Sequence, residues 1–317
     1  MTEVVGIFTI ICNLVAKATN LEESMEMVRL ISAKVTQQPS DKPHLRLQIL
    51  MHLFNVTKNP YSRFFVFKKA LDLNVEGKIT DYITPLCRDA DKFSKQWKIG
   101  TLDQRALFLS VSNVLKDKRP PPKDSFYFLT KYLATFVGED AYTMSEAKEV
   151  AVRAIVEFVK SPDRFQCDLL DMAAVEQLEK DEKYALMYQL LKIFLTQRLD
   201  AYLDFYAANS TLLKSYGLVH EDCITKMRLK SLADLGSSGS GVIPYSLIKD
   251  TLRISDTEVK FWIVKAIKAQ LFDCKIDQVN QTAIVSLDTE HVFGLPWWEA
   301  LRSKLGSWRV SQFIHRP

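Results

Sequence analysis

Glycine and proline are scarce in this sequence, with 10 glycines and 11 prolines among 317 residues. Glycine therefore makes up about 3% of the chain, against ~7% in average proteins. Dinucleotide-binding folds, β-sandwiches and β-barrels place glycine in many of their turns, so the composition disfavours all three. Closely packed long helices fit better, and the length indicates two or more domains or an array of repeats.

A surplus of either charge is also missing. Lysine and arginine number 42 and the acidic residues 38, which gives a net charge of +4. A protein that works mainly by charge-driven binding to nucleic acid usually carries a denser basic field. The composition disfavours that as the main activity and leaves only weak RNA contact open.

Cysteine pairs are absent as well. The five cysteines are isolated, odd in number and never spaced as C-x-x-C; they are Cys12, Cys87, Cys167, Cys223 and Cys274. This usage argues against a disulfide framework and predicts a reducing compartment.

The most apolar N-terminal stretch, residues 4–16, is too short to span a bilayer and is interrupted by Thr9 and Asn13. A signal peptide would place basic residues before such a stretch, but here the lead-in is Met-Thr-Glu. We expect a buried helix there, and a soluble cytoplasmic protein.

Apolar residues recur at helical spacing through the first three quarters of the chain. The runs have a typical helix length and are separated by proline, asparagine or glycine, which break helices. They cover residues 21–35, 45–56, 63–73 and 102–115, and in the first run either Leu30 or Ile31 completes the buried stripe. The spacing predicts helix pairs that recur about every 35 to 45 residues, as in a degenerate α-solenoid. A non-repeating helical domain fits the same pattern.

Two segments of unusual composition divide the chain. Residues 116–124 are charged and contain three successive prolines, which predicts a stiff, solvated linker. Residues 236–241 hold three of the ten glycines and predict a flexible tether. The block between them is again helical, with a strongly periodic part at 182–209. Its face is marked by Leu186, Leu190, Phe194, Gln197, Ala201 and Phe205.

Beyond residue 242 the pattern changes. Residues 244–252 predict a short helix, and Ser255 with Glu258 forms a capping box that opens a helix to about Gln270. Residues 272–276 and 283–287 then alternate with period two around a polar turn, which predicts a β-hairpin. Helix, helix and hairpin in this order indicate a winged helix, and a final amphipathic helix is expected from Pro296.

Local signatures of catalysis are missing from the sequence. It contains no P-loop, no GxGxxG after a strand, and no HExxH, GxSxG or calcium-loop motif. His220 and Cys223 form the most metal-like pair, but no second pair is placed to complete a zinc site. Glu221 and Asp222 fit a helix start better. We therefore expect no catalytic, cofactor-binding or metal-binding residues, and a protein that is not an enzyme.

Three lysines of the second winged-helix helix, Lys260, Lys265 and Lys268, fall on one arc of about 140° when residues are placed at 100° intervals. The opposite arc holds Val259, Trp262, Ile263, Ala266 and Ile267. The lysine arc fits either a solvated face or a nonspecific RNA contact. Arginine, asparagine and glutamine, the usual readers of base edges, are missing from it.

The last predicted helix carries an apolar stripe at spacings of three and four, formed by Trp298, Leu301, Leu305 and Trp308. Two tryptophans on a terminal helix are costly to expose, so something must cover them. Either the helix docks onto its own winged helix, or it contributes to a bundle shared between subunits.

Helical repeats followed by a winged helix and a terminal helix resemble the PCI family, which builds the proteasome lid, the signalosome and translation initiation factor three. The similarity extends to the residues: segments 184–206, 217–229, 273–278 and 292–294 with Trp298 resemble an initiation-factor subunit of this family, in a form that looks plant-like. Compared with the family, the chain looks shortened at both ends.

This resemblance implies a mainly α fold, with N-terminal helical repeats at 1–118, the helical part of a PCI domain at 125–235, its winged helix at 242–295 and a terminal helix at 296–317. It also implies a noncatalytic scaffold. Its partners would be other PCI subunits of the initiation factor and, through the complex, the small ribosomal subunit, messenger RNA and initiator tRNA.

The expected subunit interface combines the hairpin strand, taken as an exposed edge, with the terminal stripe: Ala283, Val285, Leu287, Trp298, Leu301, Leu305 and Trp308. No cofactor, membrane or small-molecule substrate is implied. A PCI subunit of the signalosome or proteasome lid, or an RNA-binding winged-helix protein, remain the alternatives.

The terminal stripe leads to a prediction. Trp298→Asp and Leu305→Asp should each release the chain from its complex while the helical repeats stay folded, because each puts a charge into an apolar contact. Copurification with tagged partner subunits measures release, and circular dichroism measures folding. If both variants still coassemble normally, the stripe packs only within its own chain.

Overall fold

A computed structural model describes residues 2–79, 83–116, 123–237, 241–288 and 302. It divides into two compact units, one of residues 1–154 with 172–174, the other of residues 155–171 with 175–317. The helical array and the small C-terminal sheet confirm a mainly α fold, a helical solenoid followed by a winged helix. No helix of the described part is long and apolar enough to cross a membrane.

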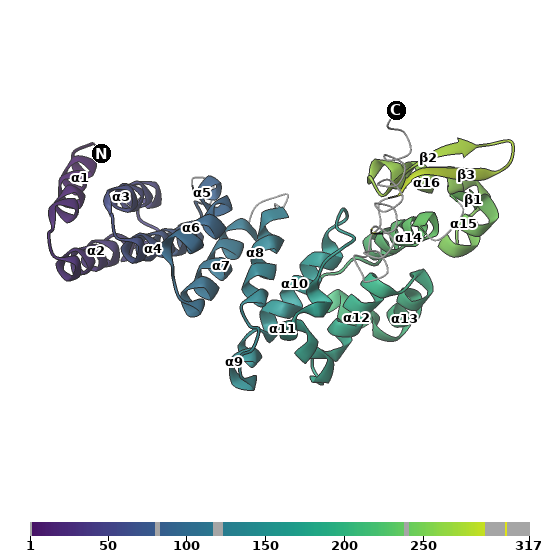
Figure 1. Cartoon of the computed structure of the whole chain (residues 1–317), viewed down its shortest axis with the longest axis horizontal. Coiled ribbons are helices and arrows are strands. Elements are labelled where there is room, and N and C mark those ends of the chain that lie inside the picture. Colours follow the sequence, from purple (N-terminus) through teal and green to yellow (C-terminus); the bar gives the residue numbers. More distant parts are fainter. Residues whose placement is uncertain (1, 80–82, 117–122, 238–240, 289–301, 303–317) are drawn as a thin grey trace, which may run out of the picture. The chain divides into compact units, whose positions relative to one another are not determined.

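The first unit is a stack of helices (Figure 1). Its elements are α1 (Thr2–Lys17), α2 (Leu21–Thr36), α3 (Pro43–Val56), α4 (Pro60–Gly77), α5 (Thr84–Arg88), α6 (Ala90–Trp97), α7 (Thr101–Lys116), α8 (Lys123–Ala134), α9 (Ala141–Glu146) and the start of α10 (Lys148–Lys160). α1 packs on α3, α2 on α4, and α4 on α7. Each helix pair therefore buries its apolar stripe against the next pair, as a solenoid requires.

Four of these helices match the predicted runs closely: α2, α3, α4 and α7. In α2 the structure chooses Ile31 over Leu30 for the stripe, because Leu30 is exposed. Periodicity does not predict α5 and α6, which are short. The face of α6 uses the small residues Ala90 and Ser94 beside Trp97, and these weaken the apolar signal.

The helix expected at residues 4–16 is present as α1, but it is buried on one face only. In α1 only one face is covered: Cys12 and Val15 are buried, whereas Ile7, Ile10 and Leu14 are exposed. The helix packs on α3 and α2 through a single stripe, and among the described residues nothing covers the other side.

An aromatic cluster forms part of the core of the first unit. Phe54 of α3, Phe64 and Phe67 of α4, and Phe93 and Trp97 of α6 have ring centroids within 5.2–6.2 Å of their neighbours. Rings at this spacing add specific edge and stacking attraction to their burial. The cluster explains why the short α6 is held in place.

The packing of α7 on α8 continues the first unit beyond the proline-rich segment, whose residues 117–122 lie outside the described part. Arg105 of α7 secures it: its Nη2 donates to the Thr135 carbonyl (2.8 Å), its Nε to Thr135 Oγ1 (3.1 Å), and it pairs with Glu139. Its guanidinium also lies 4.0 Å from the Phe136 ring centroid. The division of the chain into segments 1–118, 125–235, 242–295 and 296–317 stays a prediction.

The second unit contains helices and the sheet. Its elements are the end of α10, η1 (Leu169–Asp171), the second half of α11 (Ala173–Glu176), η2 (Gln177–Lys180), α12 (Ala185–Thr196), α13 (Leu199–Ser215), α14 (His220–Ser237), β1 (Val242–Pro244), α15 (Tyr245–Leu252), η3 (Asp256–Glu258), α16 (Val259–Lys268), β2 (Phe272–Asp277) and β3 (Thr282–Asp288). The sheet is antiparallel in the order β1-β3-β2.

Two segments of this unit differ from the sequence prediction. The periodic segment 182–209 is two helices, because Gln197 and Arg198 are extended, and Leu186 and Gln197 are exposed rather than part of one buried face. The glycine-rich tether begins later than predicted, because α14 continues through Gly236. At Gly241 a φ of +78° does require glycine.

α14 is the central helix of this unit. Three of its side chains bind carbonyls at the C-terminal ends of other helices. Lys226 donates to Phe158 and Ser161 at the end of α10, and Lys230 donates to Gln197 after α12 (2.8 Å). Arg228 donates to Leu252 (3.0 Å) and Arg253 at the end of α15. Carbonyls at the C-terminal ends of helices lack some or all of their regular helical partners, and these three side chains supply donors to them.

The buried Lys226 predicts a pH dependence of stability. Burial lowers the pKa of its ammonium to about 7, against an ordinary value of 10.5. Between these values the unfolded chain binds more protons than the folded chain, so the free energy of unfolding should rise with pH. From pH 7 to 9 this single group contributes up to ~2 kcal/mol. Urea unfolding at pH 7, 8 and 9 measures the rise.

Lys226→Met is the control for this prediction. The variant should be less stable, because the Ser161 carbonyl loses its Lys226 donor and the Phe158 carbonyl keeps only the Ser161 N–H. It should also lack the Lys226 contribution to the pH slope. Equal slopes in the two proteins would contradict the prediction.

Candidate interaction surface of the winged helix

The start of α16 is set by its sequence. Arg253 ends α15 in the left-handed conformation (φ 48°), and the backbone N–H and hydroxyl of Ser255 both donate to Glu258 Oε2 (3.0 and 2.8 Å). These hydrogen bonds favour the charged carboxylate and lower the pKa of Glu258. The predicted capping box is confirmed, and η3 leads from it directly into α16.

The inner face of α16 packs on the core of the winged helix. Val259, Trp262, Ile263 and Ala266 are buried against residues of α14, α15 and the sheet. On the outer side Lys260 and Lys268 are exposed, as the lysine arc requires. Lys265 is half-buried, because its ammonium lies over the rings of Trp262 (4.7 Å to the centroid) and Phe261 (5.6 Å).

The sequence pattern does not predict two apolar residues on the outer face of α16. Phe261 is 60% exposed and Val264 41% exposed. Their positions at 100° intervals place both between the lysines, so the same helical projection could have found them. The outer face of α16 is therefore mixed, with an aromatic ring and a valine among three basic side chains.

The hairpin strand is not the exposed edge of the sheet, and that expectation is wrong. β3 lies between β1 and β2, with Val242 opposite Ile284, and the Val285 N–H donates to the Gly241 carbonyl (2.6 Å). β1 has only three residues, too few for alternation to show in the sequence.

The strand residues chosen for the interface differ in their surroundings. Ala283 is 1% exposed and belongs to the core, and Val285 packs against the same core. Leu287 lies opposite Asp273 in the register. Trp298, Leu301, Leu305 and Trp308 lie outside the described residues. The core position of Ala283 rules out a direct contact with a partner while the sheet stays intact.

β2 forms an edge of the described sheet. The hydrogen bond from Val285 to Gly241 directs the backbone of Val285, and by alternation that of Ala283, toward β1. Cys274 and Ile276 lie opposite these two residues. In an antiparallel ladder their own N–H and C=O groups therefore point away from β3. The outer edge of β2 presents the backbone groups of these two residues for pairing.

His220 and Cys223, the most metal-like pair in the sequence, lie at the contact between α13 and α14. The hydroxyl oxygen of Tyr202, on α13, is 3.0 Å from His220 Nδ1 and hydrogen-bonds to it. The His220 ring stacks on Tyr206 with centroids 3.5 Å apart. Burial raises the pKa of the nearby Cys223 thiol. In the described part of the chain, no three histidine, cysteine or acidic side chains are grouped to hold a metal. The pair joins α13 to α14.

Comparison with known proteins identifies the family. A profile of the PCI domain matches residues 195–287. Subunit M of eukaryotic translation initiation factor 3 from Dictyostelium discoideum is 34% identical over 314 residues, which cover 98% of this chain and 77% of the relative. The chain belongs to the subunit M family.

Other members of the family support this assignment. Subunit M of Phaeosphaeria nodorum is 29% identical over 98% of this chain and 70% of its own length. The human subunit M is 28% identical over 85% of this chain and 70% of its own length. The resemblance to an initiation-factor subunit is confirmed. The PCI match runs from the end of α12 through β3, so α16 and the β2 edge both lie within the family domain.

Proposed function

We propose that this chain is a noncatalytic scaffold subunit of translation initiation factor 3. The observation that carries the proposal is the 34% identity to a subunit M over 98% of the chain. In this role it helps the complex to bind the small ribosomal subunit and to recruit messenger RNA and initiator tRNA. The named relatives speak for this complex rather than for the signalosome or the proteasome lid.

Assembly through the winged helix uses the outer edge of β2 in this proposal. The N–H and C=O groups of Cys274 and Ile276 point away from β3 and can pair with an edge strand of a neighbouring PCI subunit. Such pairing extends the sheet across the interface. This replaces β3 as the pairing strand. The terminal helix at 296–317 remains the second proposed contact.

A proline at Ile276 tests the edge. Ile276→Pro removes an N–H that points outward, so the sheet should keep its own ladder while pairing with a neighbour is blocked. Copurification from cells should lose the other initiation-factor subunits, with loss of at least about tenfold for an interface that depends on this edge. Ile276→Thr keeps the N–H and should copurify normally.

Two controls make the result interpretable. Circular dichroism and thermal melting establish that Ile276→Pro is folded. Lys275→Pro removes an N–H that points toward β3 and should destabilise the sheet itself. Recovery of the unaltered chain as a lone monomer, or with ubiquitin-related partners, would reject the proposed complex. Normal assembly of Ile276→Pro would reject only the edge.

The outer face of α16 supports a second role, a weak contact with single-stranded RNA. Exposed Phe261 offers a ring on which a base can stack, and Lys260, Lys265 and Lys268 offer charges for phosphates. The absence of base-reading side chains on this face fits binding without sequence preference.

Charge reversal tests this contact. The triple variant Lys260→Glu, Lys265→Glu and Lys268→Glu should weaken binding of a labelled ten-nucleotide uridine strand by about tenfold or more and reduce its salt dependence. Phe261→Ala should weaken binding roughly tenfold with no change in salt dependence. The matched control reverses exposed Lys192, Lys214 and Lys275 of the same unit. Equal loss in both triple variants would mean that net charge alone drives binding.

A further inference from the structure

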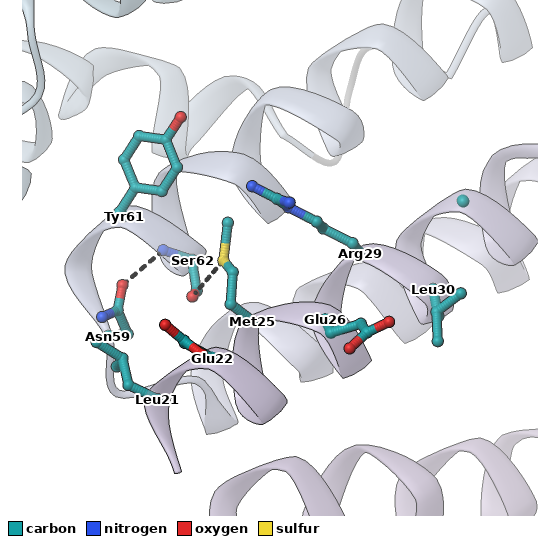
Figure 2. A pocket seen from close by; sticks show the side chains of 10 residues that line it. Leu21, Glu22, Met25, Glu26, Arg29, Leu30, Asn59, Tyr61 and Ser62 are labelled. Atoms are coloured by element: carbon teal, nitrogen blue, oxygen red, sulfur yellow. Dashed lines mark hydrogen bonds between the residues drawn. The ribbon is translucent and has the colours of Figure 1, made fainter.

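A groove runs along α2 on the first unit, between this helix and the start of α4 (Figure 2). Its volume is about 760 Å³. From α2 it is lined by Leu21, Glu22, Met25, Glu26, Arg29, Leu30 and Ala33, and from the α4 side by Asn59, Tyr61 and Ser62. All of these residues belong to one unit, so the groove exists within a single packed body.

The walls of the groove are fixed by hydrogen bonds. Asn59 caps α4 by accepting from the Ser62 N–H (2.9 Å), and the Ser62 hydroxyl donates to Met25 Sδ (2.9 Å), as Figure 2 shows. α2 is itself capped by Asn20, which accepts from the Glu22 N–H. The groove is therefore already formed before a partner arrives, which lowers the entropic cost of docking.

Exposed apolar side chains lie at both ends of the groove. Leu21 is 63% exposed and Leu30 65% exposed, with the half-buried Met25 between them. Leu30 follows Leu21 by nine positions, which is about 13.5 Å along the axis. At 100° per residue the two leucines lie on opposite flanks of the groove-lining face of α2, so one docked helix reaches both by crossing α2 obliquely over two to three of its own turns.

The groove also carries a charge pattern that calls for a basic partner. Glu22 and Glu26 are exposed and one turn apart, and neither forms an ion pair with a described residue. Like charges at this spacing repel each other. Arg29 reaches from α2 toward Tyr61 on the other side of the groove (Figure 2), away from the two carboxylates. The half of the groove that begins at Leu21 is acidic.

We propose that this groove binds an amphipathic helix of a partner subunit, with apolar residues against Leu21, Met25 and Leu30, and lysine or arginine opposite Glu22 and Glu26. An extended peptide gains its affinity from free strand edges, whereas both walls here are helices and offer no strand edge. A helix docks by side chains alone and extends the packing of α2 on α4. Only the origin of the helix, a subunit of the complex, rests on the proposed function.

Two synthetic peptides test the groove without the complex. One is a fluorescein-labelled 18-residue helix of leucine and lysine, with leucine at i, i+3 or i+4, and i+7. The other carries glutamate in place of every lysine. Fluorescence anisotropy with the whole chain should show the lysine peptide binding at least about tenfold tighter, and losing affinity as salt shortens the range of the attraction. Equal affinity, or preference for the glutamate peptide, would overturn the proposal.

Charge reversal locates the binding. Glu22→Lys with Glu26→Lys should weaken the lysine peptide roughly tenfold or more. The control is Glu23→Lys with Glu76→Lys, which changes the net charge equally at exposed positions that do not line the groove. Glu23 also shares the first turn of α2, so effects on helix stability are matched. The control pair should change affinity less than about twofold.

Position on the surface is read independently of affinity. A benzophenone on the central leucine of the lysine peptide should crosslink to residues of α2 or to Tyr61, as peptide mapping would show. Circular dichroism establishes that all variants are folded. Equal weakening by both charge-reversal pairs, or crosslinks that map elsewhere, would overturn the proposal whatever the fate of the initiation-factor assignment.

Discussion

The second unit depends on one helix that satisfies the ends of three others. Lys226, Arg228 and Lys230 of α14 donate to carbonyls that end α10, α15 and α12. The last carbonyls of a helix lack partners within that helix, and burying them unpaired would cost about 1–3 kcal/mol each. The same helix supplies Leu232 and Ala233 to the core of the winged helix. α14 therefore joins the ends of α10 and α12 to the winged helix.

This arrangement explains why the family domain is larger than a winged helix. The PCI match begins at residue 195, near the end of α12, and includes α13 and α14. Without α14 the sheet and the two short helices would lose one wall of their core. Solenoids and open sheets also leave surfaces uncovered by construction, because each repeat or strand is built to pack on a neighbour. The β2 edge, the outer face of α16 and the groove on α2 are three such surfaces.

Much of the fold could be predicted because it is encoded locally. α2, α3, α4 and α7 follow from apolar periodicity, and the capping box of Ser255 and Glu258 marks the start of the last described helix. The hairpin of β2 and β3 follows from alternation around a polar turn. Periodicity does not predict β1, because its three residues are too few to show a period. It does not predict α6 either, because Ala90 and Ser94 stand where large apolar side chains are expected. The candidate site is less predictable, because the pattern without β1 makes β3 an edge strand, although it is the central strand of the sheet.

Residue order alone determined the helical array, the position of the winged helix and the family. These features depend on the spacing of residues close together in the chain, and the fixed periods of helices and strands allow that spacing to be interpreted from the sequence. Only the tertiary structure decided which strand is an edge, that Phe261 stays exposed while Ala283 is buried, and that Lys226 caps α10 across 68 residues of sequence. Strand order, exposure and distant capping each depend on a partner far away along the chain, and no local pattern records which partner that is.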